Sequence, residues 1–376
     1  MRNHPALWPS SKWHLKKFQP DAPVLYFAPA VLQATLHRFQ AGFDGLVSYA
    51  VKANDHACVL ENLVGAGLGA FDVASLREMQ QVRAAKPDAV LHYHNPVRSI
   101  AEIDGAVGHG IASWSVDCLR ELDKLRDVPR AGTEISVRLR MPVPGAAYDF
   151  GEKFGADPDL AVNLLIRARD MGFATSMTFH PGTQCSDPQA WAVYILEAAD
   201  VARRAGVELC RLNVGGGFAA HRTGDAPDLE AIFDRIASET TRAFGVSRPK
   251  LVCEPGRAMV AEAFTLALRV KAVREGGIFL NDGVYGALTE LRDIGLPDRV
   301  TVLRADGADV QGEVRPTIVF GPTCDSIDRL PDPMLLPISI AEGDHVLVRA
   351  MGAYSTSIST GFNGYGRQEI VTVAEL

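Results

Sequence analysis

The chain has 376 residues, of which 47% are hydrophobic and 22% are charged, close to the averages of globular proteins. This composition excludes a disordered chain, a collagen and a coiled coil. The net charge of −7, from 38 basic and 45 acidic residues, argues against a general nucleic-acid binder.

Short β-like runs alternate with helical stretches through the first two-thirds of the chain. The strand-like runs are 24–28, 46–54, 69–75, 89–95, 112–117, 134–141, 174–184, 209–218 and 250–257. Helical spacing covers 29–39, 60–67, 76–84, 119–125, 159–171, 189–205 and 229–243. This alternation predicts a parallel sheet, and about eight such units favour a closed (β/α)8 barrel. An open doubly wound sheet is the alternative that the pattern leaves.

From Ala263 onward, β-like segments with Gly and Pro turns replace the long helices. We therefore predict a C-terminal all-β domain at 263–376, joined by the N-terminal segment 1–22, beside a barrel at 23–262. No apolar run reaches the ~18 residues of a membrane span, and the N-terminal stretch lacks the apolar core of a signal peptide. No membrane association is expected.

The cysteines are spread singly and form no CxxC pair, which argues against a zinc ribbon. They are also too sparse for a disulfide scaffold, so we expect reduced thiols in a cytoplasmic protein. The six are Cys58, Cys118, Cys185, Cys210, Cys253 and Cys324.

Polar residues and glycines gather at the ends of the predicted barrel strands, the face on which barrel enzymes carry out chemistry. Lys52 fits either a solvent-facing strand end or a nucleophilic lysine that forms a Schiff base. The glycines 215–217 either expose backbone N–H groups to an anion or form a flexible turn. The other members are Ser75, Asn95, Arg138, His180 and Glu254.

Three short motifs each have a functional and a structural interpretation. The run from Glu254 to Arg257 could place a carboxylate beside a cation, or be a surface turn. His180 and Thr183 could stack on a flat ring and bind a phosphate, or be structural. Cys324 with Asp325 fits a proton donor beside a cation-binding carboxylate, or a buried thiol beside a turn.

The metal and triad alternatives have less support. His92 and His94 share one face of a predicted strand, but no third ligand with suitable spacing is visible, so no metal site is predicted. No GxSxG elbow occurs, and the glycine run matches neither a dinucleotide fingerprint nor a Walker loop.

Eight motifs occur in the order found in one enzyme family: YAVKAN, FDVAS, HPGTQ, NVGGGF, CEPGR, NDGVYG, GPTCDSID and MGAYSTSISTGFNGYG. Over roughly residues 24–370, the chain resembles the group IV pyridoxal-phosphate decarboxylases, and within them the ornithine decarboxylases. The resemblance implies the alanine-racemase-like fold: a (β/α)8 barrel that binds pyridoxal 5'-phosphate, plus a C-terminal β-domain. It also implies a head-to-tail homodimer with two shared active sites.

The resemblance assigns a role to individual residues of this sequence. It makes Lys52 the lysine that carries the cofactor, Glu254 the carboxylate paired with the ring nitrogen, and His180 the histidine stacked on the ring. The remaining cofactor residues that it implies are Asp72, Arg138, Thr183, Gly215, Gly216, Gly217, Gly256, Arg257 and Tyr354.

The partner subunit would supply Cys324 as the acid that protonates Cα and Asp325 as the acceptor of the distal ammonium. Tyr285 and Phe362 would join them. Lys153 and Asp328 resemble an ion pair between subunits. The resemblance also implies a second acidic group after Tyr285, for which Asp293 and Glu290 are the candidates, with Asp293 the assigned substrate residue.

Asp at position 325 favours ornithine or lysine over diaminopimelate, because diaminopimelate enzymes usually carry Glu there. We therefore expect decarboxylation of L-ornithine to putrescine and CO2, in polyamine biosynthesis, with L-lysine as a second substrate. A decarboxylase of another diamino acid and a non-catalytic homologue are the alternatives. No nucleic-acid partner is expected.

Overall fold

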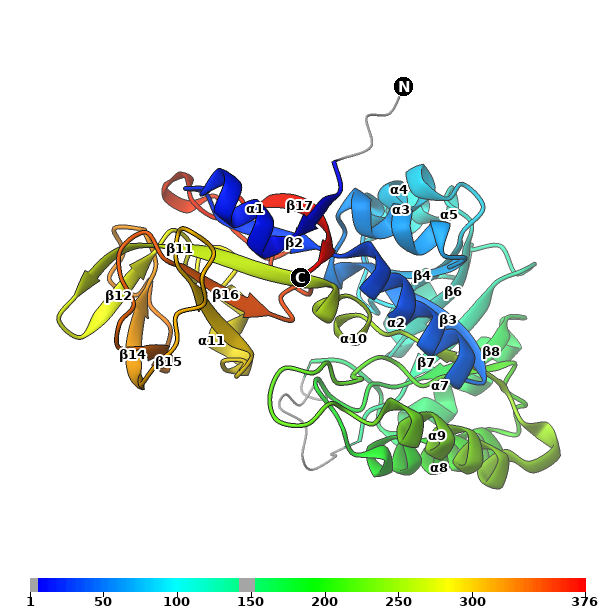
Figure 1. Cartoon of the computed structure of the whole chain (residues 1–376). Coiled ribbons are helices and arrows are strands. Elements are labelled where there is room, and N and C mark those ends of the chain that lie inside the picture. Colours follow the sequence, from blue (N-terminus) through cyan, green and yellow to red (C-terminus); the bar gives the residue numbers. More distant parts are fainter. Residues whose placement is uncertain (1–5, 142–152) are drawn as a thin grey trace. The chain divides into compact units, whose positions relative to one another are not determined.

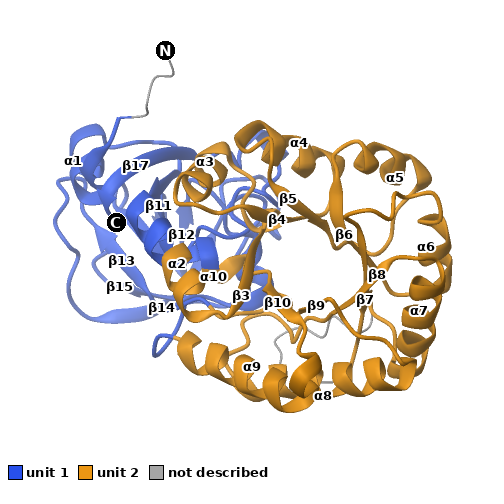
Figure 2. Ribbon diagram, turned by 90° about the vertical axis from the view of Figure 1, so that its right-hand side faces the viewer, with its two compact units in different colours: residues 1–35, 220–226, 259–376 blue, residues 36–219, 227–258 orange. Residues whose placement is uncertain are grey.

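The computed structural model describes residues 6–141 and 153–376, which form two compact units (Figure 2). Unit 2 comprises Leu36–Ala219 and Pro227–Ala258, and unit 1 comprises Met1–Thr35, Ala220–Ala226 and Met259–Leu376. The chain passes from unit 1 to unit 2 within helix α2 (Pro29–Gly42), enters unit 1 briefly at Ala220–Ala226, and returns to it finally within the short helix α10 (Arg257–Val260).

Unit 2 is a closed barrel of eight parallel strands, in which β10 pairs with β3 to complete the ring. Its strands are β3 (Gly45–Ala50), β4 (Ala70–Val73), β5 (Val90–Tyr93), β6 (Ile111–Val116), β7 (Glu134–Arg138), β8 (Ala174–Thr178), β9 (Arg211–Asn213) and β10 (Lys250–Cys253). The predicted barrel is confirmed, and the open-sheet alternative is excluded.

Helices surround the barrel strands on the outside (Figure 2). They are α3 (Ala57–Gly65), α4 (Leu76–Ala85), α5 (Ile100–Val107), α6 (Leu119–Lys124), α7 (Pro158–Asp170), α8 (Pro188–Ala205) and α9 (Leu229–Phe244). Several begin at a capping side chain: Ser75 accepts from the Glu78 N–H, and Ser99 forms a capping box with Glu102. Such caps start a helix soon after a strand, which leaves the strand ends to loops that carry polar side chains.

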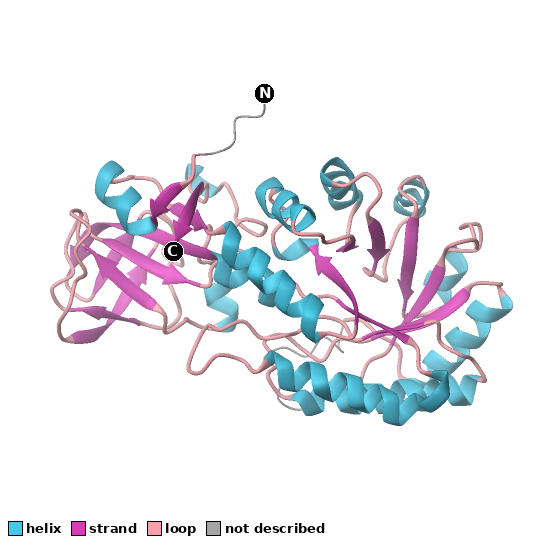
Figure 3. Cartoon of the chain, turned by 45° about the vertical axis from the view of Figure 1, so that its right-hand side comes forward, coloured by secondary structure: helices cyan, strands magenta, loops and turns pink. Residues whose placement is uncertain are grey.

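Unit 1 contains a nine-stranded mixed sheet with little helix (Figures 1 and 3). The main path runs β1 (Trp8–Ser10), β17 (Glu369–Glu375), β2 (Val24–Phe27), β11 (Phe264–Arg274), β12 (Gly277–Leu280), β14 (Val314–Phe320) and β15 (Met334–Pro337). Strand β16 (His345–Arg349) pairs with β11 and with β13 (Val300–Leu303). The helices α1 (Ser11–Phe18) and α11 (Thr289–Ile294) complete the unit.

One predicted barrel strand lies in the other unit. The run at 24–28 forms β2, which pairs antiparallel with β11 and parallel with β17. All four residues of β2 are buried. A short apolar run is stabilised by any sheet that buries it, so its sequence does not reveal which sheet it joins. The barrel closes without it because nine strand-like runs precede Ala263 and only eight are needed.

None of the helices described in residues 6–141 and 153–376 is both long and apolar enough to cross a membrane.

Candidate active site

The polar residues predicted at strand ends lie at the carboxyl ends of the barrel strands. Lys52 lies in a 3-10 turn (Val51–Ala53) directly after β3, and Asp72 is in β4. The Ala50 N–H donates to the Pro255 carbonyl oxygen at 3.2 Å, which ties the lysine-bearing turn to the loop after β10. The others are Arg138 at the end of β7, His180 after β8, Gly215–Gly217 after β9 and Glu254 after β10.

Glu254 is the centre of a buried hydrogen-bond network. Its Oε1 contacts His94 Nδ1 at 2.5 Å and accepts from Asn213 Nδ2 at 2.6 Å. The Gly215 N–H donates to Asn213 Oδ1 at 2.9 Å, so the amide nitrogen faces the carboxylate. His94 Nε2 lies 2.9 Å from Ser113 Oγ. These side chains come from different strands, so only closure of the barrel brings them together.

The charges of Glu254 and His94 stabilise each other. Burial acts to raise the pKa of Glu254, but the charge and hydrogen bond of His94, with the Asn213 amide, lower it to about 2. Burial acts to lower the pKa of His94, but Glu254 outweighs it, and the pKa is raised above its ordinary value. The pair is therefore a carboxylate hydrogen-bonded to an imidazolium.

His92, in β5, differs from His94 in its hydrogen bonding and its charge. Its ring stacks on His94 with centroids 5.4 Å apart, and neither ring nitrogen has a hydrogen-bond partner among the described residues. Burial and the nearby His94 charge lower the pKa of His92 to about 3, so it is neutral.

Glu254 lies beside His92 and His94 as a third potential metal ligand, which the sequence spacing did not reveal. One ring nitrogen each of His92 and His94 and one carboxylate oxygen of Glu254 lie within 4.8 Å of one another. Two ligands of one zinc ion, each about 2.1 Å from it in tetrahedral geometry, lie more than 3 Å apart. The 2.5 Å contact between His94 and Glu254 is shorter than this, so it is a hydrogen bond between the two side chains.

The buried Asp72 and the half-buried Glu78 carry two more carboxyl groups near Lys52. Burial and the charge of Glu254 raise the pKa of Asp72 to about 7, while Lys52 opposes the rise. Burial raises the pKa of Glu78 as well, although its Oε2 accepts from the Ala74 N–H at 2.7 Å. The lysine therefore lies among carboxyl groups that hold protons more readily than usual.

His180 is a neutral imidazole with a defined tautomer. Its Nδ1 accepts from the Gly182 N–H at 3.1 Å, so the proton lies on Nε2. Burial, together with the charges of Lys52 and Arg138, lowers its pKa to about 3. A neutral, held ring is suited to stacking on a flat aromatic group, the role that the resemblance implies.

The three glycines after β9 are required by close backbone packing. Gly215 and Gly217 have φ of 70° and 85°, and a Cβ on them would lie 2.1 Å from the Phe179 carbonyl oxygen and 2.2 Å from that of Gly182. A Cβ on Gly216 would lie 2.6 Å from the Glu254 carbonyl oxygen. The loop after β9 therefore has no room for side chains, and Thr183 lies in a neighbouring loop. Backbone N–H groups and a hydroxyl are donors of the kind that bind the phosphate of pyridoxal phosphate.

Two arginines complete the polar groups of the barrel. Arg138 lies with its guanidinium 5.3 Å from the Phe154 ring centre, and burial lowers its pKa. Arg257 is buried at the start of α10. The preceding Gly256 packs against the lysine-bearing turn, where a Cβ would lie 3.1 Å from Ala53 Cβ.

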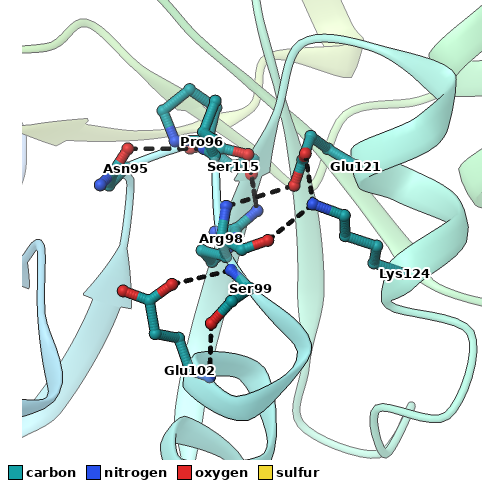
Figure 4. Close-up of polar contacts among 9 residues, drawn as sticks. Asn95, Pro96, Arg98, Ser99, Glu102, Ser115, Glu121 and Lys124 are labelled. Atoms are coloured by element: carbon teal, nitrogen blue, oxygen red, sulfur yellow. Dashed lines mark hydrogen bonds and ion pairs between the residues drawn. The ribbon is translucent and has the colours of Figure 1, made fainter.

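The loop that follows β5 is held by the buried Arg98 (Figure 4). Its guanidinium donates to the carbonyl oxygens of Tyr93 at 3.0 Å and of Ser115. Lys124 Nζ donates to the Arg98 carbonyl oxygen and to Glu121 Oε1, both at 2.6 Å. Arg98 therefore joins the end of β5 to β6 and α6, which fixes the strand that carries His94.

Four residues assigned to the substrate side gather in loops of unit 1. The Tyr285 hydroxyl donates to Asp325 Oδ2 at 2.6 Å, and the Tyr285 and Phe362 rings lie 4.8 Å apart. Cys324 Sγ donates to Asn363 Oδ1 at 3.3 Å. The Tyr285 hydrogen bond lowers the pKa of Asp325, so its half-buried carboxylate is ionised. We name Tyr285, Cys324, Asp325, Phe362 and Asn363 the loop cluster.

Other predicted residues of unit 1 are placed as follows. Tyr354 has a left-handed backbone, with φ of 58°. Asp293, on α11, pairs with the adjacent Arg292 at 2.9 Å, while Glu290 on the same helix is buried. Asp328 is buried, and its carboxylate accepts from the Val284 and Thr323 N–H groups and from the Thr323 hydroxyl. Asp328 therefore anchors its own loop, whereas the resemblance implies an ion pair with the exposed Lys153.

Sequence reasoning considered His94 only as a metal ligand and did not single out Asn213, Glu78 or Asn363. His94 and Asn213 each had a signal, since one follows a barrel strand and the other ends the strand before the glycine run. Asn363 had none, because a loop asparagine is an ordinary turn residue.

Comparison with protein families matches residues 30–261 to the model described as "Pyridoxal-dependent decarboxylase, pyridoxal binding domain". Decarboxylase flvG of Aspergillus flavus is 33% identical over 344 residues, covering 84% of this chain and 77% of that protein. The lysine/ornithine decarboxylase of Selenomonas ruminantium is 32% identical, over 85% of this chain and 81% of its own. The ornithine decarboxylase of Mus musculus is 30% identical, over 86% and 74%.

Two solved structures resemble the chain over nearly its whole length. The Paramecium bursaria Chlorella virus arginine decarboxylase has a TM-score of 0.85 and 25% identity, covering 95% of this chain and 98% of that one. The lysine/ornithine decarboxylase of Vibrio vulnificus, solved with cadaverine, has a TM-score of 0.82 and 27% identity, covering 96% and 95%.

Proposed function

The chain belongs to the pyridoxal-dependent decarboxylases, and from this premise we propose that it converts L-ornithine to putrescine and CO2. Pyridoxal phosphate is its cofactor, and a basic amino acid is its class of substrate. One observation carries the choice of substrate: the half-buried Asp325 carboxylate is held ionised by the Tyr285 hydroxyl beside Cys324. This pair suits the distal ammonium of a diamino acid.

When bound, pyridoxal phosphate accepts the electron pair that departing CO2 leaves at Cα. Lys52 would hold the cofactor, and the glycine loop with Thr183 would bind its phosphate through backbone N–H groups and a hydroxyl. Glu254 would hold a proton at the ring nitrogen, because a buried carboxylate favours a cation beside it. His180 would lie against the ring. Asp72, Arg138, Gly256, Arg257 and Tyr354 remain the other proposed cofactor residues.

Cys324 is the proposed acid that delivers a proton to Cα after CO2 leaves. The contact of Sγ with Asn363 Oδ1 at 3.3 Å orients its thiol. Phe362 and Tyr285 would form an apolar wall beside the carbon chain of the substrate. Asp325 would accept the ammonium at its far end, and an ammonium withdrawn from water without such a partner would be costly.

We propose that the loop cluster completes the barrel site of a second subunit in a homodimer. Cys324 is exposed and Phe362 is 42% exposed in the single chain. A proton donor at a carbanion works only where water is excluded, so these exposed groups need a second surface. The cytoplasm is the proposed compartment, since all six cysteines are free thiols.

L-Lysine is the second candidate substrate. The relatives include a lysine/ornithine decarboxylase, and α11 departs in sequence from the usual ornithine form around the candidate second acid Asp293. Lysine has one methylene more than ornithine, and one methylene changes the free energy of transition-state binding by about 1–3 kcal/mol. A pocket that holds the ammonium with one carboxylate therefore discriminates only modestly between ornithine and lysine.

Product analysis tests the proposal. The purified protein with pyridoxal phosphate would be given L-ornithine, L-lysine, meso-diaminopimelate and L-arginine separately, and kcat/KM compared from amine and CO2 released. Putrescine as the dominant product supports ornithine, and cadaverine in similar yield assigns dual specificity. Lysine formed from diaminopimelate, or agmatine from arginine, would overturn the role given to Asp325. No product from any of them would favour a non-catalytic homologue.

A further inference from the structure

Glu254 is bonded to a histidine for which the resemblance implies no role. The resemblance assigns Glu254 to the ring nitrogen of the cofactor. In the structure, its Oε1 lies 2.5 Å from His94 Nδ1, and both residues are at most 9% exposed. A contact this short between a carboxylate and an imidazole, withdrawn from water, is a charge-assisted hydrogen bond. The carboxylate already has a cation beside it before any cofactor binds.

We propose that His94 is a positioning residue that serves as the counter-cation of Glu254 until the cofactor binds, and then remains as its neutral hydrogen-bond donor. His94 would give up the proton on Nε2 and keep the one on Nδ1, while the ring nitrogen gains a proton. The site thus keeps one positive charge beside one carboxylate. This inference rests on the cofactor site and is independent of which amino acid is the substrate.

The surroundings of His94 favour a cation in the absence of the cofactor. Glu254 from the end of β10, Asp72 from β4 and Glu134 from β7 all act to raise its pKa against burial. His92, its neighbour on β5, is neutral and adds no charge. Arg138 of β7 is a further cation, whose charge interacts with that of Glu254.

The imidazole is held in a single orientation. Ser113 Oγ lies 2.9 Å from Nε2, and Asn213 Nδ2 lies 3.1 Å from Nδ1 because both nitrogens converge on Glu254 Oε1. The Ser113 hydroxyl accepts from Nε2 when His94 is charged and donates to it when His94 is neutral. Both protonation states of His94 are therefore compatible with the same geometry. Arg98 holds the end of β5, just before His94, through the Tyr93 carbonyl oxygen (Figure 4).

The test compares the apoprotein with the protein loaded with pyridoxal phosphate. Thermal unfolding midpoints would be measured for wild type, His94→Ala and the matched control His92→Ala, which removes a buried imidazole that makes no hydrogen bond to Glu254. His94→Ala leaves the buried carboxylate of the apoprotein without its cation, whereas in the loaded protein the ring nitrogen supplies one. Pyridoxal phosphate should therefore raise the unfolding midpoint of His94→Ala by about 3 °C more than it raises the midpoint of His92→Ala.

The same linkage predicts that His94→Ala binds pyridoxal phosphate about tenfold more tightly than His92→Ala. His94→Asn keeps a neutral N–H near the position of Nδ1, so it should show the same sign with better folding. A third readout is pH. Because the pKa of His94 is raised, its stabilisation of the wild-type apoprotein is complete below its ordinary value and lost as pH rises through the raised one. That decline should be absent in both His94 variants.

Equal rises in midpoint for His94→Ala, His94→Asn and His92→Ala would overturn the proposal, because they would reduce His94 to a packing residue. A smaller rise in the His94 variants would overturn it too, since His94 would then stabilise the loaded protein more than the apoprotein. No substrate enters the measurement, so a wrong substrate assignment leaves its outcome unchanged.

Discussion

The barrel site and the loop cluster differ in how completely their polar side chains are buried and hydrogen-bonded within the single chain. In the barrel, Glu254, His94 and Asn213 are buried and bonded to one another before any ligand is present. In the loop cluster, Asp325 and Cys324 have local partners, but Asp325 is only half-buried and Cys324 is exposed to water.

This difference agrees with what each region is proposed to bind, the cofactor in the barrel and the substrate at the loop cluster. A cofactor that stays in place is best met by rigid groups whose charges are already balanced, because no reorganisation is then needed. A substrate enters and leaves, so the groups that select it must be reached from solvent and covered afterwards. The comparison predicts that changes in the barrel act on cofactor binding, and that changes in the loop cluster act on substrate turnover.

The largest effect is expected at Lys52, where the barrel site would be broken outright. Lys52→Ala should lower kcat by about 10⁴-fold or more, because the group that holds the cofactor is lost. Borohydride reduction followed by mass spectrometry should add the mass of the cofactor to wild type but not to the variant. Lys250→Ala is the matched control, because Lys250 begins strand β10 at the amino end of the barrel, whereas Lys52 lies at the carboxyl end. Cofactor attached elsewhere in an active Lys52→Ala protein would contradict the assignment.

The next effect tests whether the two regions act across subunits. Cys324→Ala should lower kcat by about 10²–10⁴-fold, as expected for loss of a general acid. Mixing it with Lys52→Ala should restore about a quarter of wild-type activity, since half of randomly formed dimers combine both chains and each has one intact site. Activity would be measured after subunit exchange, with each variant alone as the control. If the mixture stays inactive, the sites are not shared.

A smaller effect should separate cofactor binding from turnover. Gly216→Ala places a Cβ 2.6 Å from the Glu254 carbonyl oxygen, so the loop after β9 must shift. A shift of that kind costs about 1–3 kcal/mol, so the Kd for pyridoxal phosphate should rise about tenfold or more while KM for the substrate changes little. Gly65→Ala is the control, because a Cβ there meets nothing within 4 Å. Unchanged cofactor affinity would remove the glycine loop from the phosphate site.

The smallest effect concerns the pH dependence that the loop cluster confers. The Tyr285 hydroxyl lowers the pKa of Asp325, so Tyr285→Phe should raise it. The Asp325 carboxylate is then protonated at a higher pH, so the acid limb of the kcat/KM profile should shift to higher pH. The maximum value of kcat/KM should fall by less than about tenfold. Tyr365→Phe serves as the control. A profile that coincides with wild type would show that Asp325 does not bind the substrate ammonium in its ionised form.

The sequence predicted most of the fold because the alternation of apolar runs and helices is a local property. Lys52, His180, the glycines 215–217 and Glu254 could also be placed, since each follows a strand and the ends of parallel strands meet at one face. The run at 24–28 was assigned to the wrong sheet, because burial on both faces looks the same in a barrel and in a mixed sheet.

By itself, the sequence determined which residues are candidates for the chemistry and which end of the barrel Lys52, His180, the glycines 215–217 and Glu254 occupy. Only the tertiary structure decided which of them touch. His94 and Glu254 lie on strands far apart in the chain, and their pairing depends on barrel closure and on the exclusion of water that strengthens their contact. The pairing of Tyr285 with Asp325 arises in the same way, from loops that the sheet of unit 1 brings together, because no local pattern records a contact between distant side chains.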